Sequence, residues 1–131
     1  MKRVITYGTF DLLHVGHVAL LQRARALGDQ LIVGLSTDRF NRECKGKECV
    51  IPYEDRRTML YNLRHVDAVI PEDSWEQKVS DVHKYGISVF CIGDDWKGKF
   101  DFLEDEGVEV VYLPRTPGVS TSQIKSKLSG R

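Results

Sequence analysis

Two histidines near the amino terminus carry the clearest chemical signal in this sequence. They belong to the string His14-Val15-Gly16-His17, which stands at the start of a predicted helix. Gly16 lets an anion approach the backbone, and the N–H groups of a first helical turn attract phosphate. The two imidazoles can add hydrogen bonds to phosphate oxygens. Taken alone, the same spacing is also compatible with a helix cap or with half of a metal site.

A second polar segment precedes the last predicted helix. It reads Arg115-Thr116-Pro117-Gly118-Val119-Ser120-Thr121-Ser122. A guanidinium, several hydroxyls and helix N–H groups come together there, which indicates a second phosphate-binding loop. The alternative is structural, with Gly118 forming a turn and Ser120 capping the helix.

A pair of lysines lies in a long connection between the second predicted strand and a helix that follows Pro52. Lys45 and Lys47 could close over a triphosphate and offset its charge. A solvated basic loop is the alternative. The first interpretation predicts a segment that is mobile without ligand and ordered with it.

Composition and missing motifs exclude several classes of function. Nineteen basic and nineteen acidic residues cancel, so no long-range field would collect nucleic acid or an anionic membrane. No GxGxxG follows the first predicted strand and no GxxxxGK[ST] occurs, which argues against dinucleotide-dependent redox chemistry and P-loop hydrolysis. The first apolar run is too short for a signal peptide or a membrane span, so a cytoplasmic location is expected.

The three cysteines do not indicate a metal site. Cys91 lies within an apolar run and is expected to be a buried thiol. Cys44 and Cys49 flank a charged stretch without a second ligand pair, so zinc is not favoured.

Short β-rich runs alternate with segments of helical periodicity, which predicts a parallel sheet with crossover helices. The expected strands cover 3–7, 31–36, 68–70, 89–92 and 108–113, and the expected helices cover 18–27, 53–63, 76–85 and 120–128, with a helical turn at 101–106. We therefore expect one α/β domain, residues 1–131, with a doubly wound, five-stranded, Rossmann-like parallel sheet.

The expected strand order brings two polar loops together. With the first and fourth strands side by side at the centre, Gly8-Thr9-Phe10-Asp11 and Gly93-Asp94-Asp95-Trp96 leave the sheet at its switch point. The histidine string follows the first of these loops directly. Its position and its chemistry therefore both favour a phosphate site at that edge.

These residues as a set resemble the bacterial glycerol-3-phosphate cytidylyltransferases of teichoic acid precursor synthesis, within the wider HxGH nucleotidyltransferases. The likeness extends over essentially the whole chain. It is carried by residues 4–17, by Val69-Ile70-Pro71-Glu72 and Trp75-Glu76-Gln77-Lys78, by residues 93–103, and by Arg115-Thr116 with residues 118–121. The resemblance implies a nucleotidyltransferase fold and transfer of CMP from CTP to glycerol 3-phosphate, giving CDP-glycerol and pyrophosphate. It also implies a homodimer. The chemistry of this transfer predicts Mg²⁺ (or Mn²⁺), which would neutralise the leaving pyrophosphate.

The resemblance assigns roles to particular residues. His14, His17, Lys47 and Arg115 would serve catalysis, and Lys45 and Lys78 would bind the acceptor. CTP would contact Thr9, Phe10, His14, Val15, Gly16, His17, Lys47, Arg64, Asp95, Arg115, Thr116, Pro117, Gly118, Val119, Ser120, Thr121 and Ser122. Asp11 would support the site or a metal. Two departures stand out: Pro117 replaces a usual acidic residue and Ser122 a usual threonine, which changes the local backbone because proline lacks an N–H.

Other interpretations remain open at this point. The same fold could serve another cytidylyltransferase, such as one for ethanolamine phosphate, or an adenylyltransferase that makes a cofactor. A nucleotide-sensing module without turnover and a flavodoxin-like electron carrier are alternatives from different functional classes.

Nucleotidyl transfer requires no protein nucleophile, since the acceptor phosphate can attack the α-phosphorus in line. Catalysis then consists of positioning and charge stabilisation.

Overall fold

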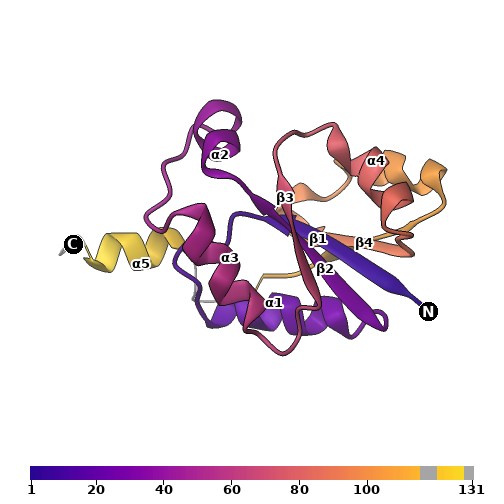
Figure 1. Ribbon diagram of the computed structural model, residues 1–131, viewed down its shortest axis with the longest axis horizontal. Helices are drawn as coiled ribbons and strands as arrows, with labels where there is room; N and C mark the ends of the chain where they lie inside the picture. The colour runs from indigo at the N-terminus through magenta and orange to yellow at the C-terminus, as the bar shows by residue number, and fades with distance from the viewer. Residues whose placement is uncertain (116–120, 129–131) are drawn as a thin grey trace.

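The computed structural model describes residues 1–115 and 121–128, and within 121–128 it describes the side chains of 124, 125, 127 and 128 (Figure 1). In chain order the elements are β1 (Arg3–Gly8), α1 (Val15–Arg25), β2 (Gln30–Ser36), α2 (Asp38–Cys44), α3 (Tyr53–Tyr61), β3 (Ala68–Glu72), α4 (Gln77–Lys84), β4 (Val89–Gly93), the 3₁₀ turns η1 (Asp94–Trp96) and η2 (Asp101–Glu106), β5 (Glu109–Leu113) and α5 (Thr121–Leu128). No helix within these ranges is both long and apolar enough to cross a membrane.

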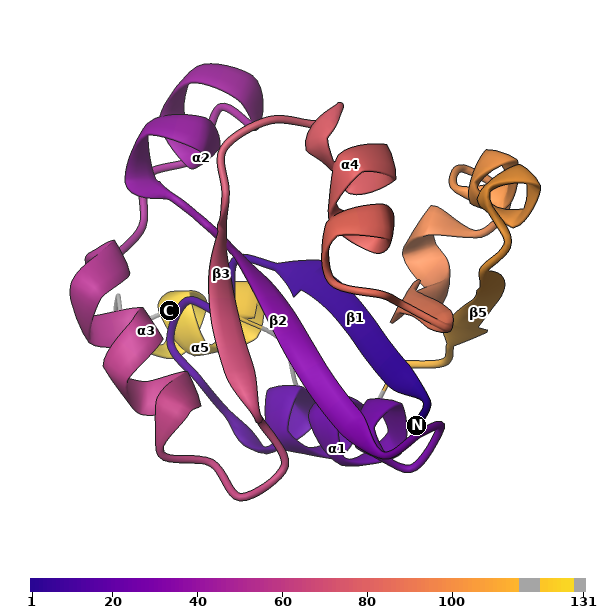
Figure 2. The ribbon, with the colours of Figure 1, turned by 45° about the vertical axis from the view of Figure 1, so that its right-hand side comes forward.

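All five strands form one parallel sheet in the order β3-β2-β1-β4-β5, and Figure 2 shows the fan of β3, β2 and β1. The chain winds outward from β1 in both directions, so β1 and β4 are central neighbours, with Val4 opposite Val89. The predicted doubly wound fold is therefore confirmed. The switch point lies where β1 and β4 end.

Both faces of the sheet are covered, which explains why its strands are continuously apolar. Successive residues of β1 point to opposite sides, and Val4 and Ile5 are both fully buried. Val4 joins a core with Leu21 of α1 and Leu60 of α3, whereas Ile5 joins a core with Val82 of α4. The helices α1 and α3 accordingly lie on one face of the sheet and α4 on the other (Figures 1 and 2).

The prediction of a long loop after β2 is partly wrong, because the first half of this connection forms the helix α2. The Thr37 hydroxyl accepts a hydrogen bond from the Phe40 N–H at 3.1 Å, which caps the helix. Phe40 and Asn41 lie on the inner face of this helix and are fully buried. Lys45 is consequently the residue at the carboxyl end of a helix, and only the segment after it is irregular.

Other boundaries shift by a few residues. β3 continues through Pro71 to Glu72, which an edge strand tolerates because proline need not donate to the ladder. The predicted turn at 101–106 is confirmed as η2. The predicted buried thiol of Cys91 is also confirmed.

Candidate active site

A pocket of about 620 Å³ opens beside the carboxyl end of β1. Its walls come from the β1–α1 loop, from the segment after α2, from the loop before α4, from η1 and from α5. The lining residues are Gly8, Thr9, Phe10, Asp11, His17, Lys45, Lys47, Glu48, Cys49, Trp75, Trp96 and Lys125. The pocket therefore lies at the predicted edge of the sheet.

The loop between β1 and α1 has an unusual backbone. Phe10 and Leu12 both adopt a left-handed conformation with φ 51°, which costs energy for residues with side chains. Gly8 makes room for the Phe10 ring, since a Cβ at Gly8 would stand 2.8 Å from a ring carbon. The buried Phe10 ring meets His17 edge-on, with 5.2 Å between ring centroids. The loop thus fixes one wall against which His17 packs.

The two histidines cap α1 and stack on each other. Nδ1 of His14 accepts a hydrogen bond from the Gly16 N–H at 3.0 Å, and Nδ1 of His17 accepts one from the His14 N–H at 3.2 Å. The rings are parallel to within 21°, with centroids 3.8 Å apart. The sequence interpretation offered the Gly16 N–H to a ligand phosphate. In the structure that N–H is engaged by the His14 ring.

This arrangement decides which protons the histidines carry. Burial first, and then the neighbouring His14, lower the pKa of His17 to about 4, and burial also lowers the pKa of His14. Both rings are therefore neutral at pH 7. Because each Nδ1 accepts a hydrogen bond, each ring proton resides on Nε2. The pair presents neutral Nε2–H donors, and His17 lines the pocket.

The lowered pKa of His17 predicts a pH dependence of stability. Between the ordinary pKa of 6.5 and about 4, the unfolded chain binds a proton that the folded chain does not, so the free energy of unfolding falls as pH falls through this window. We expect the contribution to reach at most about 3 kcal/mol. His17→Asn keeps an acceptor near the position of Nδ1. Its free energy of unfolding, measured by urea denaturation, should fall less between pH 7 and pH 4 than that of the wild-type protein. Parallel curves for the two proteins would contradict the assignment.

The two lysines predicted to bind the acceptor converge on one carboxylate. Nζ of Lys78 lies 2.7 Å from Oε2 of Glu72, and both side chains are 1% exposed. Nζ of Lys45 lies 3.8 Å from Oε1 of Glu72 and donates to the Ser36 hydroxyl at 2.9 Å. Lys45 lines the pocket, whereas Lys78 lies behind it, covered by the Trp75 ring at 5.1 Å.

Asp11 organises the loop that carries Lys47. Its two carboxylate oxygens accept the N–H groups of Val50 and Ile51 at 2.8 and 2.9 Å. Nζ of Lys125, on α5, lies 3.6 Å from the same carboxylate. Asp11 therefore ties the segment after α2 and the last helix to the β1–α1 loop.

Four other predicted residues lie in three different places. Thr9 is in the pocket wall and its hydroxyl bonds the buried Asn41 at 2.8 Å. Arg115 and Asp95 are exposed and pair with each other, with Nε of Arg115 2.9 Å from the carboxylate. Arg64 is exposed in the α3–β3 connection, at the opposite edge of the sheet, so the structure does not bring it to this pocket.

Part of the second predicted phosphate loop lies outside the described residues. Thr116, Pro117, Gly118, Val119 and Ser120 fall there, and so do the side chains of Thr121 and Ser122. Val15, in contrast, is described and is 65% exposed at the first position of α1.

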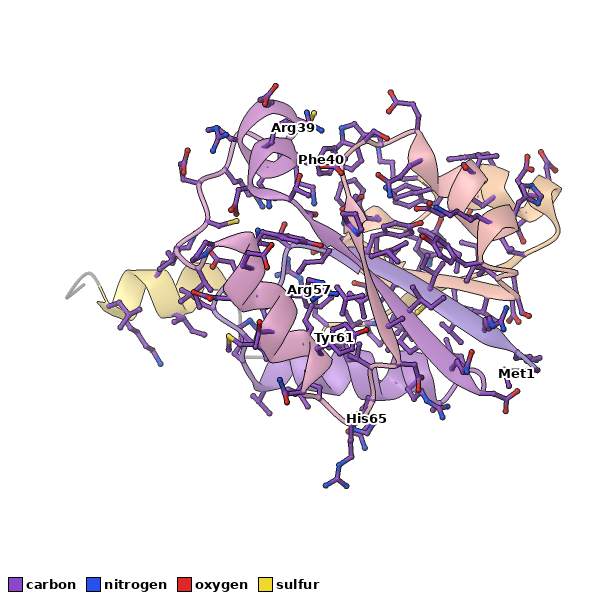
Figure 3. All side chains as sticks on the ribbon, viewed as in Figure 1. Met1, Arg39, Phe40, Arg57, Tyr61 and His65 are labelled. Atoms are coloured by element: carbon purple, nitrogen blue, oxygen red, sulfur yellow. The ribbon has the colours of Figure 1, made fainter. Side chains whose placement is uncertain are left out.

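Sequence reasoning missed several residues that build the site. Trp75, Trp96 and Lys125 line the pocket, and the Trp75 and Trp96 rings lie 5.7 Å apart. Phe40 projects from α2 toward the segment after β3 (Figure 3), where its ring meets Trp75 at 5.0 Å. Arg56 is buried and binds four separate segments. The tryptophans had a sequence signal, since both stand in loops at the carboxyl edge of the predicted sheet.

Comparison with known proteins gives a family. The cytidylyltransferase-like family model matches residues 5–127. Glycerol-3-phosphate cytidylyltransferase of Bacillus subtilis (strain 168) is 58% identical over 130 residues, which cover 99% of either chain. The protein of that name from Staphylococcus aureus (strain NCTC 8325 / PS 47) is 57% identical over 131 residues, covering 100% of this chain and 98% of that protein.

A solved structure agrees with the fold. The lipopolysaccharide core biosynthesis protein from Thermoplasma volcanium GSS1 is 27% identical and superposes with a TM-score of 0.75, covering 88% of this chain and 98% of that one. The chain belongs to the cytidylyltransferase-like family. Within it, the full-length matches are to glycerol-3-phosphate cytidylyltransferases, which confirms the resemblance found in the sequence.

Proposed function

We propose that this protein transfers CMP from CTP to glycerol 3-phosphate, releasing pyrophosphate and forming CDP-glycerol. The observation that carries the proposal is the identity of 58% to a glycerol-3-phosphate cytidylyltransferase along the full length of both chains. The pocket supports it, since the neutral Nε2–H donor of His17 and the ammonium groups of Lys45 and Lys47 line one cavity at the switch point of the sheet.

In the proposed reaction, an oxygen of the acceptor phosphate forms a bond to the α-phosphorus of CTP as the bond to the pyrophosphate oxygen breaks. The protein positions both phosphates and stabilises the charge that gathers on the α-phosphate oxygens. The Nε2–H donors of His14 and His17 serve these oxygens, Lys45 serves the acceptor phosphate, and Lys47 serves the triphosphate. Arg115 is assigned to the β,γ end of CTP.

Lys125 adds a cation that the sequence interpretation did not include. It reaches the pocket from α5 and stands 3.6 Å from Asp11. We assign it to the triphosphate together with Lys47, because both ammonium groups enter the same cavity.

Mg²⁺ (or Mn²⁺) is part of the proposal. Among the described residues, no group of three histidine, cysteine or acidic side chains could hold a metal. The pocket carboxylates are Asp11 and Glu48. This donor set suits an ion that arrives on the phosphates of CTP, as Mg²⁺ ordinarily does, with these two side chains as the available protein ligands. The ion would neutralise the leaving pyrophosphate.

The test is pyrophosphate release from CTP or ATP with a panel of phosphorylated alcohols, in the presence of Mg²⁺. We expect CTP with glycerol 3-phosphate to turn over faster than any other pair, with CDP-glycerol as the product. Ethanolamine phosphate and ATP serve as the matched alternatives. A preference for ATP, or nucleotide binding without any turnover, would contradict the proposed function.

A cytoplasmic location and a homodimer complete the proposal. The first is supported by the short first apolar run of the sequence, and the second by the family resemblance alone. Sedimentation of the purified protein tests the dimer.

A further inference from the structure

We propose that Glu72 and Ser36 are positioning residues for the acceptor phosphate, and that they act through the ammonium groups of Lys45 and Lys78. The inference rests on the proposed function, because it concerns the same reaction. It adds a carboxylate and a hydroxyl that do not line the pocket.

The sheet itself brings Glu72 and Ser36 together. Glu72 ends β3, Ser36 ends β2, and the two residues are partners in the register of these parallel strands. The Ser36 hydroxyl donates to Oε1 of Glu72 at 2.6 Å, and Ser36 and Glu72 are 0% and 1% exposed. The carboxylate is therefore fixed at the carboxyl edge of the sheet, close to the pocket.

Lys45 is held over this pair. Its Nζ donates to the Ser36 hydroxyl, which in turn donates to Glu72, so ammonium, hydroxyl and carboxylate form a continuous chain. The rings of Phe40 and Trp75 lie 5.3 and 5.5 Å from the same ammonium. The side chain is 14% exposed, and its exposed part faces the pocket. Ser36 and Glu72 thus aim Lys45 at the ligand space.

Lys78 pairs with the other carboxylate oxygen of Glu72, Oε2. Its ammonium is surrounded by the rings of Tyr7, Trp75 and Phe100, at 4.6, 5.1 and 5.4 Å. Burying an ammonium in such surroundings costs free energy unless a paired anion compensates for the lost hydration. Glu72 supplies that anion. Lys78 then adds positive charge directly behind Lys45.

The same balance acts on Lys45. Burial lowers its pKa, Glu72 raises it, and the neighbouring Lys78 and Lys47 lower it. Without Glu72, burial and the two cations are opposed only by the smaller effect of Cys49. We therefore expect the loss of the carboxylate to weaken binding of a phosphomonoester dianion, although a negative charge has been removed from a cationic site.

The experiment compares KM for glycerol 3-phosphate and for CTP in wild-type protein and in Glu72→Gln, which keeps the shape of the side chain and removes its charge. We expect the acceptor KM to rise about tenfold or more and the CTP KM to stay within about twofold. Glu72→Asp, which keeps the charge, should restore part of the acceptor affinity. Ser36→Ala, which removes only one hydroxyl, should raise the acceptor KM several-fold.

The control for lost stability is Val82→Ala. Val82 is buried on α4, one helical turn from Lys78, and contributes to the core only. This variant should lower the thermal midpoint and leave both KM values unchanged. If Glu72→Gln does not fold, Ser36→Ala and Glu72→Asp decide the question. An acceptor KM that is unchanged or lowered in the folded variants would overturn the inference, whereas a wild-type protein without turnover would instead overturn the proposed function.

Discussion

Replacing His17 by asparagine should lower kcat by about 10²- to 10³-fold while the protein stays folded and retains most of its affinity for CTP. His17 lines the pocket and carries its proton on Nε2, because Nδ1 accepts the His14 N–H. Charge gathers on the α-phosphate oxygens as the new bond forms, so a fixed donor is worth more in the transition state than in the bound ground state. The variant loses this donor.

The choice of substitution separates catalysis from helix capping. An asparagine oxygen can stand near the position of Nδ1 and continue to accept the His14 N–H, whereas His17→Ala removes both the donor and the acceptor. We expect His17→Ala to be ~1 kcal/mol less stable than His17→Asn. Its kcat should fall about as far as that of His17→Asn. Thermal midpoint, CTP dissociation constant and kcat are to be measured on one preparation. Wild-type turnover in His17→Asn would limit His17 to a capping role.

The core of this fold was accessible from the sequence because its strands are covered on both faces. β2 was expected at 31–36 and runs from Gln30 to Ser36, since its side chains are mostly apolar and all its residues except Gln30 are buried. The helix α2 was not expected, because its seven residues are mostly charged and only Phe40 and Asn41 face inward. The Thr37 cap was the local signal that could have revealed it.

The location of the site was likewise predictable, and its internal arrangement was not. Strand order places the loops after β1 and β4 at one edge, whatever their residues. Which nitrogen of His17 faces the pocket, however, depends on a cap that forms only when the helix does. Lys78 illustrates the same limit. Its type and position suggested contact with substrate, yet its ammonium lies against Glu72, a partner that only the packing of β3 on α4 supplies.

Replacing Arg56 by alanine should be the most destabilising single change near the site. The side chain is fully buried and donates to the backbone carbonyls of Thr9, Ser36 and Ile51, each at 2.8 Å. It also bonds the Asp38 carboxylate at 2.7 Å. One guanidinium therefore joins the β1–α1 loop, the end of β2, the start of α2 and the segment that precedes α3. No sequence pattern indicates this role, because most of its partners are main-chain atoms.

We expect Arg56→Ala to lower the free energy of unfolding by about 3–5 kcal/mol, because three buried or partly buried carbonyls lose their donor. Arg56→Lys should recover little of this loss, since one ammonium cannot reproduce a fork that reaches four acceptors. The neighbouring Arg57→Ala is the control. Arg57 lies over the exposed Tyr61 ring on the outer face of α3 (Figure 3), a contact worth only about 0.5–1 kcal/mol. Urea denaturation measures the stability of each variant. CTP titration of the folded variants should show weaker binding for Arg56→Ala and Arg56→Lys, and unchanged binding for Arg57→Ala. Equal stability of Arg56→Ala and Arg57→Ala would show that the four segments are held together by other contacts.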